Sequence, residues 1–215
     1  MVKKTINDAF ELLFDCYGRQ YWWPGETSWE VCTGAVLTQN TNWHNVEKAI
    51  ELLKFNDALC PGKILNLPLD KLEQAIRPSG FFRLKAVRLR AVAEWWLKYS
   101  AVIATGAKNK TVMLKWRESL LAVNGVGPET ADSILLYCFE LPVFVIDAYT
   151  RRISSRHFGM PENISYHELQ KIFMDNLPED VKLYNEYHAL LVKNSKELCH
   201  KYICAPECPL RQLNL

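Results

Sequence analysis

Two glycines, Gly125 and Gly127, separate two stretches of helical periodicity near the middle of the chain. The apolar residues of 120–123 close the first stretch, and the second runs from Thr130 to Leu136. Glycines at such a junction permit backbone angles that a Cβ atom would forbid, and they leave backbone N–H groups exposed at the start of the second helix. Because such donors attract anions, we expect this loop to bind phosphate.

A carboxylate follows the hairpin at a short distance in sequence. The apolar run 143–146 leads directly to Asp147, so we expect the run to carry this carboxylate to the edge of a packed core. A helical pattern begins at Ala148, and aspartate is a preferred N-cap residue. Asp147 is therefore expected to cap a helix, to take part in chemistry, or to do both.

The composition is that of a folded soluble protein. The chain has 215 residues, of which 49% are apolar, enough for one large domain or two small ones. There is no run of about 18 apolar residues, and the N-terminal residues do not form a signal peptide, so we expect a cytoplasmic protein without membrane association. The formal net charge of +2 does not by itself indicate a nucleic-acid partner.

Helical periodicity covers nearly the whole chain and no strand pattern is convincing, so we predict an all-α fold. Asn7 or Asp8 is the expected cap of the first helix, and Ser28 of the second. The helix over 81–99 carries a group of basic residues in its first half, which we expect on a solvated face or in contact with phosphate. They are Arg83, Lys85, Arg88 and Arg90. Besides the hairpin, helices are expected over 6–17, 29–37, 43–53, 69–76, 81–99, 148–158, 166–177 and 184–198.

Three motifs together carry a family resemblance. They are the turn Leu37-Thr-Gln-Asn-Thr, the hairpin Asn124-Gly-Val-Gly-Pro-Glu-Thr, and Asp147, eighteen residues after Glu129. They resemble the endonuclease III superfamily of helix-hairpin-helix DNA glycosylases. The resemblance implies two all-helical lobes with the active-site cleft between them, one formed by 26–134 and the other by 1–25 with 135–215. It also implies double-stranded DNA with a damaged base as the partner, and we expect a monomer.

The resemblance makes Asp147 the catalytic residue. Hydrolysis of an N-glycosidic bond leaves a sugar with oxocarbenium character, which a nearby carboxylate stabilises, and the carboxylate can also accept a proton from the attacking water. Asp132 is a second carboxylate close to the hairpin. Because it lies within the following helix, we expect it to be a solvated or capping group.

The chain departs from the family pattern at Glu129. Bifunctional members have a lysine at this position, whose amine forms a Schiff base with the sugar and leads to strand cleavage. A carboxylate cannot form that imine, and the preceding Pro128 supplies no replacement amine. We therefore expect hydrolysis by water without AP lyase activity. Glu129 itself is expected either as a first-turn residue favoured by the helix dipole or as a polar wall of the base pocket.

Aromatic residues suggest which base is removed. A flipped base needs aromatic or apolar surfaces on either side, for which the candidates are Trp22, Trp23 and Trp43, although tryptophans of this kind are also common in cores. The Trp-Trp-Pro segment and 76–82 resemble the 3-methyladenine branch of the superfamily. An N3- or N7-alkylated purine is cationic, so it leaves without an added acid and is attracted to an indole face by about 0.5–2 kcal/mol.

The expected DNA contacts lie in the turn and the hairpin. Gln39 matches the family residue that enters the base stack in place of the flipped nucleotide, and is otherwise an ordinary turn amide. The full set is Gln39, Asn124, Gly125, Gly127 and Thr130. The favoured function is a monofunctional glycosylase that removes alkylated purines such as 3-methyladenine and needs no cofactor for catalysis. The alternatives are a mismatch or oxidised-base glycosylase, and a non-catalytic DNA-binding module, which would not need Asp147.

Three of the seven cysteines, Cys199, Cys204 and Cys208, lie close together near the C-terminus. Many relatives in the family carry four cysteines there, which hold a 4Fe–4S cluster. Here the fourth cysteine is missing, although a cubane cluster normally takes four thiolates. A non-cysteine ligand such as His200 would complete a cluster; otherwise the site would hold zinc or remain as free thiols. In each case we expect its role to be structural.

Overall fold

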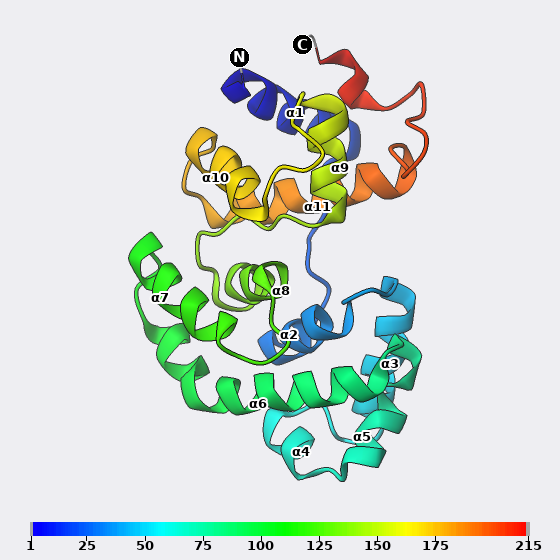
Figure 1. Cartoon of the computed structure of the whole chain (residues 1–215), viewed down its shortest axis with the longest axis vertical. Helices are drawn as coiled ribbons and strands as arrows, with labels where there is room; N and C mark the ends of the chain where they lie inside the picture. Colours follow the sequence, from blue (N-terminus) through cyan, green and yellow to red (C-terminus); the bar gives the residue numbers. More distant parts are fainter. Residues whose placement is uncertain (1, 214–215) are drawn as a thin grey trace. The chain divides into compact units, whose positions relative to one another are not determined.

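The computed structural model describes residues 2–213, and it confirms the all-α fold (Figure 1). Within these residues the only strand-like pairing is a single bridge between Cys199 and Cys204. None of the described helices is both long and apolar enough to cross a membrane. The helices are α1 (Val2–Tyr17), α2 (Ser28–Leu37), α3 (Trp43–Phe55), α4 (Pro61–Asn66), α5 (Leu69–Ala75), α6 (Phe82–Thr105), α7 (Lys110–Leu121), α8 (Pro128–Ser133), α9 (Ala148–His157), α10 (Tyr166–Asn176) and α11 (Val181–Glu197), with the short turns η1 (Arg77–Ser79), η2 (Ile134–Cys138) and η3 (Pro209–Gln212).

The chain divides into two compact units. One consists of Met1–Trp23 and Pro142–Leu215, and the other of Pro24–Leu141. We refer to them as the terminal unit and the central unit. The division into functional lobes at 26–134 stays a prediction.

The central unit is built around α2, which is buried along nearly its whole length. Thr27 begins this helix because its side chain accepts a hydrogen bond from the backbone N–H of Glu30 at 3.1 Å. The helix packs against α3, α6 and η2, and the ring of Trp29 lies 5.2 Å from that of Trp96 on α6. The 24 residues of α6 also cover α4 and α5. This packing provides the support for the hairpin formed by α7 and α8.

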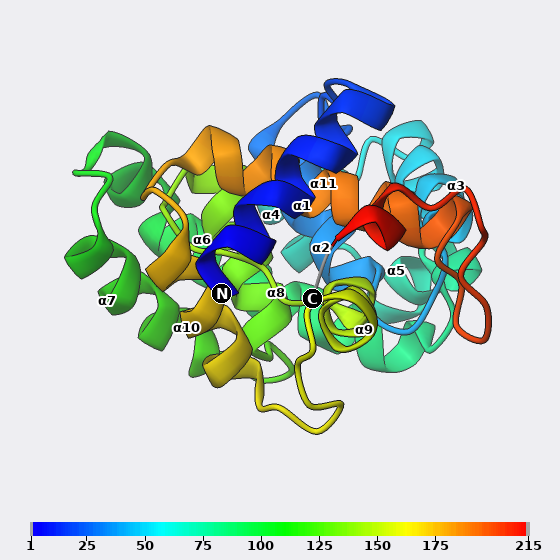
Figure 2. The same ribbon diagram turned by 90° about the horizontal axis from the view of Figure 1, so that it is seen from above.

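The terminal unit brings the two ends of the chain together. Helix α1 packs against α10, α11 and η3, while α9 packs against α11 (Figure 2). Phe144, in the extended segment of this unit that precedes α9, stacks on Phe173 of α10 with 4.4 Å between ring centroids. Tyr184 and Tyr187 of α11 are fully buried beside Phe144. These aromatic contacts fix the segment that precedes Asp147.

Several local predictions were wrong at helix ends. Helix α1 begins at Val2, so Asn7 and Asp8 lie inside it and cap nothing. Thr27, one residue before Ser28, is the cap of α2. Helix α4 was not among the expected helices, although it begins at Pro61 and proline is favoured in the first turn of a helix.

The basic residues of α6, expected on a solvated face or in contact with phosphate, do not share one environment. Arg83 is exposed, whereas Lys85 is fully buried and donates hydrogen bonds to the carbonyls of Leu37 (2.8 Å) and Ser79 (2.6 Å). Arg88 donates to the side chain of Gln39. Arg90 donates to the carbonyl of Leu67, so three of these cations satisfy oxygen atoms inside the central unit.

Candidate functional site

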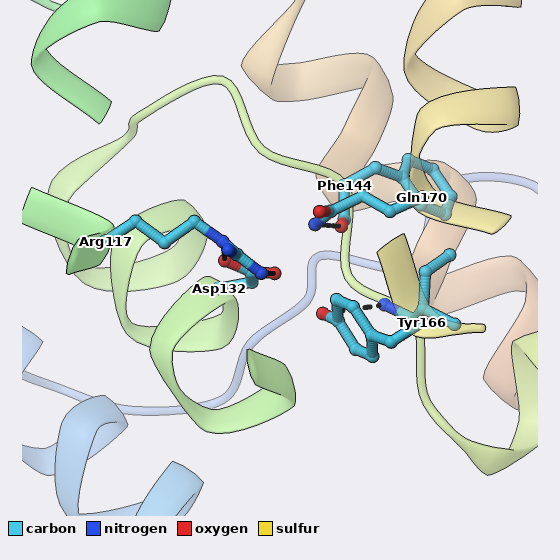
Figure 3. Close-up of polar contacts among 6 residues, drawn as sticks. Arg117, Asp132, Phe144, Tyr166 and Gln170 are labelled. Atoms are coloured by element: carbon cyan, nitrogen blue, oxygen red, sulfur yellow. Dashed lines mark hydrogen bonds and ion pairs between the residues drawn. The ribbon is translucent and has the colours of Figure 1, made fainter. Parts of the chain in front are cut away.

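Asp147 lies at the end of a buried, extended segment. Residues 142–146 have no exposed side chain, and two side chains of α10 hold their backbone in place. Gln170 Nε2 donates to the carbonyl of Phe144 at 2.7 Å, and the backbone N–H of Ile146 donates to the Tyr166 hydroxyl at 3.4 Å (Figure 3). The apolar run predicted from the sequence is thus anchored at two points, and Asp147 follows it at the N-cap of α9.

The carboxylate of Asp147 makes two kinds of contact. Oδ1 accepts a hydrogen bond from the backbone N–H of Thr150 at 2.7 Å, so Asp147 does cap α9. Oδ2 lies 3.5 Å from Nε2 of His188, a buried residue of α11. Burial opposes ionisation, but the charge and hydrogen bond of His188, together with the hydrogen bonds of Thr150, outweigh it and lower the pKa of Asp147. The site therefore holds an ionised carboxylate.

Sequence reasoning missed His188. The residue occurs in the apolar stretch Tyr187-His-Ala-Leu-Leu-Val, where a polar side chain must find a partner once it is buried. That pattern signals a buried contact, but it does not identify Asp147, which lies 41 residues away in the sequence. The partner becomes visible only when α9 and α11 pack together.

An aromatic group lies close to Asp147 in the same unit. Burial, and then the charge of Asp147, raise the pKa of Tyr149. The ammonium of Lys196 lies 5.9 Å from the ring centroids of both Tyr149 and Trp22, and the Trp22 and Trp23 rings are 5.4 Å apart at 61°. Two of the three predicted pocket tryptophans therefore lie near Tyr149, which follows Asp147 by two residues.

The third tryptophan lies in the central unit. Trp43 is the first residue of α3, is partly exposed, and donates from Nε1 to Glu47 Oε1 at 2.7 Å. Trp43 is thus not among the fully buried residues of that unit.

Gln39 is the centre of a hydrogen-bond network that holds the hairpin. Its Nε2 donates to the Thr130 hydroxyl at 3.0 Å and to the carbonyl of Gly125 at 3.2 Å, while its Oε1 accepts from Arg88. Gly125 has a φ of +82°, and a Cβ atom there would lie 2.6 Å from Cδ of Arg88. This position therefore requires glycine for both its backbone conformation and its space.

Three other hairpin residues are exposed to solvent. Asn124, Gly127 and Glu129 are exposed, and Gly127 is the N-cap of α8, which begins at Pro128, two residues before the predicted start. Glu129 is thus a first-turn residue of α8, as one of the two interpretations expected. Its further role as a pocket wall stays a prediction.

Asp132 is neither solvated nor a cap, so that expectation was wrong. It is fully buried and forms a two-pronged ion pair with Arg117 of α7, with Nε–Oδ1 at 2.6 Å and Nη2–Oδ2 at 3.1 Å (Figure 3). The pair ties together the two helices of the hairpin. Because its oxygens are engaged by a guanidinium, Asp132 is a structural carboxylate.

The C-terminal cysteines gather around a histidine that the sequence did not identify. His157, the last residue of α9, places Nε2 3.5 Å from the sulfurs of both Cys199 and Cys204. Cys208 lies in hydrogen-bonding contact with Cys199 and His157, and its pKa falls to about 3, chiefly because of the contact with Cys199. His200, the expected non-cysteine ligand, is exposed and is not part of this group.

Comparison with known proteins places this geometry in a family. Residues 33–179, which include the Gln39 turn, the hairpin and Asp147, match the model of the HhH-GPD superfamily of base excision DNA repair proteins. The chain belongs to this superfamily. It is therefore a DNA glycosylase of base excision repair.

Relatives cover most of this glycosylase. The "Putative DNA repair glycosylase" of Methanocaldococcus jannaschii is 47% identical over 212 residues, covering 99% of this chain and 96% of the relative. Endonuclease III of Sulfolobus acidocaldarius is 27% identical and covers 80% of this chain and 78% of its own length. The alignment thus extends well beyond the hairpin.

Two solved structures share the fold. An endonuclease III–DNA complex superposes with a TM-score of 0.81 at 22% identity, covering 98% of this chain and 94% of its own. The 3-methyladenine DNA glycosylase of H. pylori, bound to 1,N6-ethenoadenine, gives a TM-score of 0.74 at 29% identity, with 91% and 97% covered. Both likenesses support the all-helical fold of this HhH-GPD protein.

Proposed function

We propose that this HhH-GPD protein is a monofunctional DNA glycosylase that removes alkylated purines, such as 3-methyladenine, by Asp147-assisted hydrolysis of the N-glycosidic bond. The observation that carries the proposal is the ionised Asp147 carboxylate held between Thr150 and His188. A carboxylate in this state stabilises positive charge that develops on the sugar and can take a proton from the attacking water. A protein that only bound DNA would need this side chain for no more than its cap on α9.

Glu129 supports the monofunctional part of the proposal. It occupies the position at which bifunctional members of the family carry the Schiff-base lysine, and a carboxylate cannot form an imine. Lys85 cannot substitute, because its buried amine is bound to two backbone carbonyls. Lys196 is an exposed amine near Tyr149, so it is the amine to examine in any test for a covalent intermediate.

Trp22 and Trp23 support a cationic base as the substrate. Lys196 already lies within cation–π range of Trp22, so this indole ring attracts positive charge in the resting protein. An alkylated purine carries a delocalised positive charge and stacks on an indole more completely than an ammonium does. The H. pylori relative, named as a 3-methyladenine glycosylase, agrees with this choice.

The hairpin and the Gln39 turn are proposed to bind the DNA backbone and the gap in the base stack. Asn124 and Gly127 are exposed beside the start of α8, where backbone N–H groups favour phosphate, while Gly125 and Thr130 shape the loop. To enter the stack, Gln39 would exchange its hydrogen bonds to the hairpin for contacts with DNA. We propose that the enzyme acts as a monomer.

The cysteine cluster lies too far from Asp147 to take part in this chemistry. Asp147 and His157 lie at opposite ends of α9, a ten-residue helix, and are thus about 15 Å apart. Whatever the cysteines bind contributes to the structure of the terminal unit rather than to the reaction.

Base release from a panel of duplexes tests the proposal. The substrates carry 3-methyladenine, 7-methylguanine, uracil, or adenine opposite 8-oxoguanine, each assayed with and without alkali. We expect release of the alkylated purines and strand breaks only after alkali. Strand breaks without alkali, or an adduct trapped by borohydride, would refute the monofunctional assignment, and loss of the adduct in Lys196→Gln would identify the amine. Preferred release of uracil or adenine would show that the substrates are not alkylated purines.

A further inference from the structure

We propose that His157, Cys199, Cys204 and Cys208 bind a single zinc ion, in place of the four-iron cluster that the family resemblance implies. The ligand set joins a histidine at the end of α9 to three cysteines that lie 42–51 residues later in the chain. The inference concerns the architecture of the terminal unit and does not depend on the substrate of the enzyme.

The donor distances are those of one shared ion. Nε2 of His157 lies 3.5 Å from the sulfurs of Cys199 and Cys204, and the three donor atoms are all within 4.8 Å of one another. Zinc bonds of about 2.3 Å to sulfur and 2.0–2.1 Å to nitrogen, at tetrahedral angles, place S and N about 3.6 Å apart and two sulfurs about 3.8 Å apart. The two S–N separations already match a tetrahedral edge.

The same residues do not fit a cubane. A 4Fe–4S cluster binds its four thiolates on four different iron atoms, so the sulfurs stand apart at the corners of the cluster. Here one imidazole nitrogen lies between two sulfurs, and only three cysteines are present in this region of the chain. A Cys3His set that fills all four coordination positions is a common structural zinc site.

Cys208 is the fourth ligand of the proposed set. Its thiol is in contact with Cys199 and His157, and Asn194 Nδ2 lies 3.5 Å from its sulfur. Arg156 Nη1 donates to the Cys199 sulfur at 3.2 Å. Hydrogen bonds of this kind stabilise thiolates and orient them toward a metal.

The surrounding backbone holds the ligands in place. Cys199 and Cys208 are buried, as is His157, so the site is closed on most sides. Arg152 Nε donates to the carbonyl of Cys199 at 2.9 Å, and the N–H of Ala205 donates to the carbonyl of Leu198 at 2.7 Å. A metal here would fasten the C-terminal segment to α9 and α11.

Metal content of the full-length protein, produced in medium with both iron and zinc, is the first measurement. We expect about one zinc per chain, no visible absorption from iron–sulfide, and, after exchange with Co²⁺, the thiolate charge-transfer and strong d–d bands of tetrahedral cobalt. Four irons per chain with matching sulfide would overturn the proposal. So would a protein without metal that fails to bind added Zn²⁺ or Co²⁺ when its thiols are reduced.

Variants of two histidines test whether His157, and not the nearby His200, is the zinc ligand. His157→Gln should lose the zinc and the tetrahedral cobalt bands, whereas His157→Cys supplies a fourth thiolate and should keep one zinc, which guards against a simple folding defect. His200→Gln, in the same loop but outside the site, is the matched control and should retain full stoichiometry. An unchanged cobalt spectrum in His157→Gln, or loss of zinc in His200→Gln alone, would refute this ligand set.

Discussion

Nε2 of His188 lies 3.5 Å from Oδ2 of Asp147, and the His188 side chain is only 5% exposed. The pair joins the end of a buried, extended segment to the middle of α11. The opposite oxygen of Asp147 is occupied by the Thr150 N–H, so both the position and the charge of the carboxylate are set by its neighbours. One residue thereby combines the helix cap and the charged group that the sequence left as alternatives.

Asp147→Asn should abolish base release while DNA binding and folding are retained. Asparagine caps a helix as well as aspartate does, so α9 should remain intact, but the amide carries no negative charge for the sugar and accepts no proton from water. We expect the single-turnover rate to fall by about 10²–10⁴-fold. The melting temperature and the affinity for a damaged duplex serve as controls. Full activity would remove Asp147 from the mechanism.

His188→Gln should shift the acid limb of the pH–rate profile to higher pH. His188 helps to lower the pKa of Asp147, and without its charge the burial of the carboxylate favours the protonated form. Activity that needs the ionised carboxylate is then lost at a higher pH as the solution is acidified. His44→Gln, at an exposed histidine of α3, is the control. A rate reduced equally at every pH, with no shift of the limb, would show that His188 acts only through packing.

Gly125→Ala should destabilise the hairpin and weaken DNA binding together. The φ of +82° is strained for alanine by about 1–3 kcal/mol, and the added Cβ would lie 2.6 Å from Cδ of Arg88, which holds Gln39. Gly62→Ala is a matched control because a Cβ at Gly62 meets nothing within 4 Å and its helix, α4, tolerates alanine. Thermal melting and titration with a damaged duplex measure both effects. Equal behaviour of the two variants would contradict the close packing at Gly125.

Lys85 gives the protein a pH-dependent stability with a defined sign. Burial, together with the charge of Arg88, lowers the pKa of Lys85 from 10.5 to about 8 in the folded protein. Between these values the unfolded chain holds a proton that the folded protein has released, so the contribution of Lys85 to the free energy of unfolding becomes more favourable as pH rises through this window.

Lys85→Met should remove this dependence. The variant leaves the carbonyls of Leu37 and Ser79 without their donor, so we expect a loss of about 1–3 kcal/mol at pH 7. Urea unfolding of both proteins between pH 7 and 10 gives the difference in their free energies of unfolding. The contributions of the other titrating groups cancel in this difference. A constant difference across the range would contradict the lowered pKa.

Site residues could be predicted from the sequence where a local pattern marks them, and not where they depend on a partner far away in the chain. The structural positions of the hairpin glycines and of Asp147 were predicted because local signals mark them: a helix break, and a carboxylate after an apolar run. His188 and His157 were not found, because their partners lie 41 and 42 residues away in the sequence and become neighbours only through helix packing. Asp132 was misjudged for the same reason, since Arg117 belongs to the preceding helix.

The charges of α6 show a second limit of sequence reasoning. Helical periodicity placed Lys85 correctly on the helix, but a lysine carries an apolar stem that can be buried if its amine finds acceptors. The acceptors are carbonyls at the end of α2 and in η1, two elements whose packing against α6 no local pattern encodes.

Glu129→Lys should introduce the covalent chemistry that the wild-type residue excludes. Glu129 is an exposed residue in the first turn of α8, where the positive end of the helix dipole disfavours an ammonium and lowers the pKa of a lysine placed there. A neutral amine at this position can attack the sugar and form a Schiff base. We expect borohydride to trap a protein–DNA adduct with the variant and not with the wild type.

The yield of this adduct should rise with pH, because more of the new lysine is then neutral, and Glu129→Gln should give none. Combining Glu129→Lys with Lys196→Gln should leave the adduct unchanged if the introduced amine is the nucleophile. An adduct that disappears in the double variant would assign the chemistry to Lys196. If the variant folds and still binds a damaged duplex but forms no adduct, residue 129 does not face the sugar. That result would remove the main support for the role of Glu129 in deciding between hydrolysis and strand cleavage.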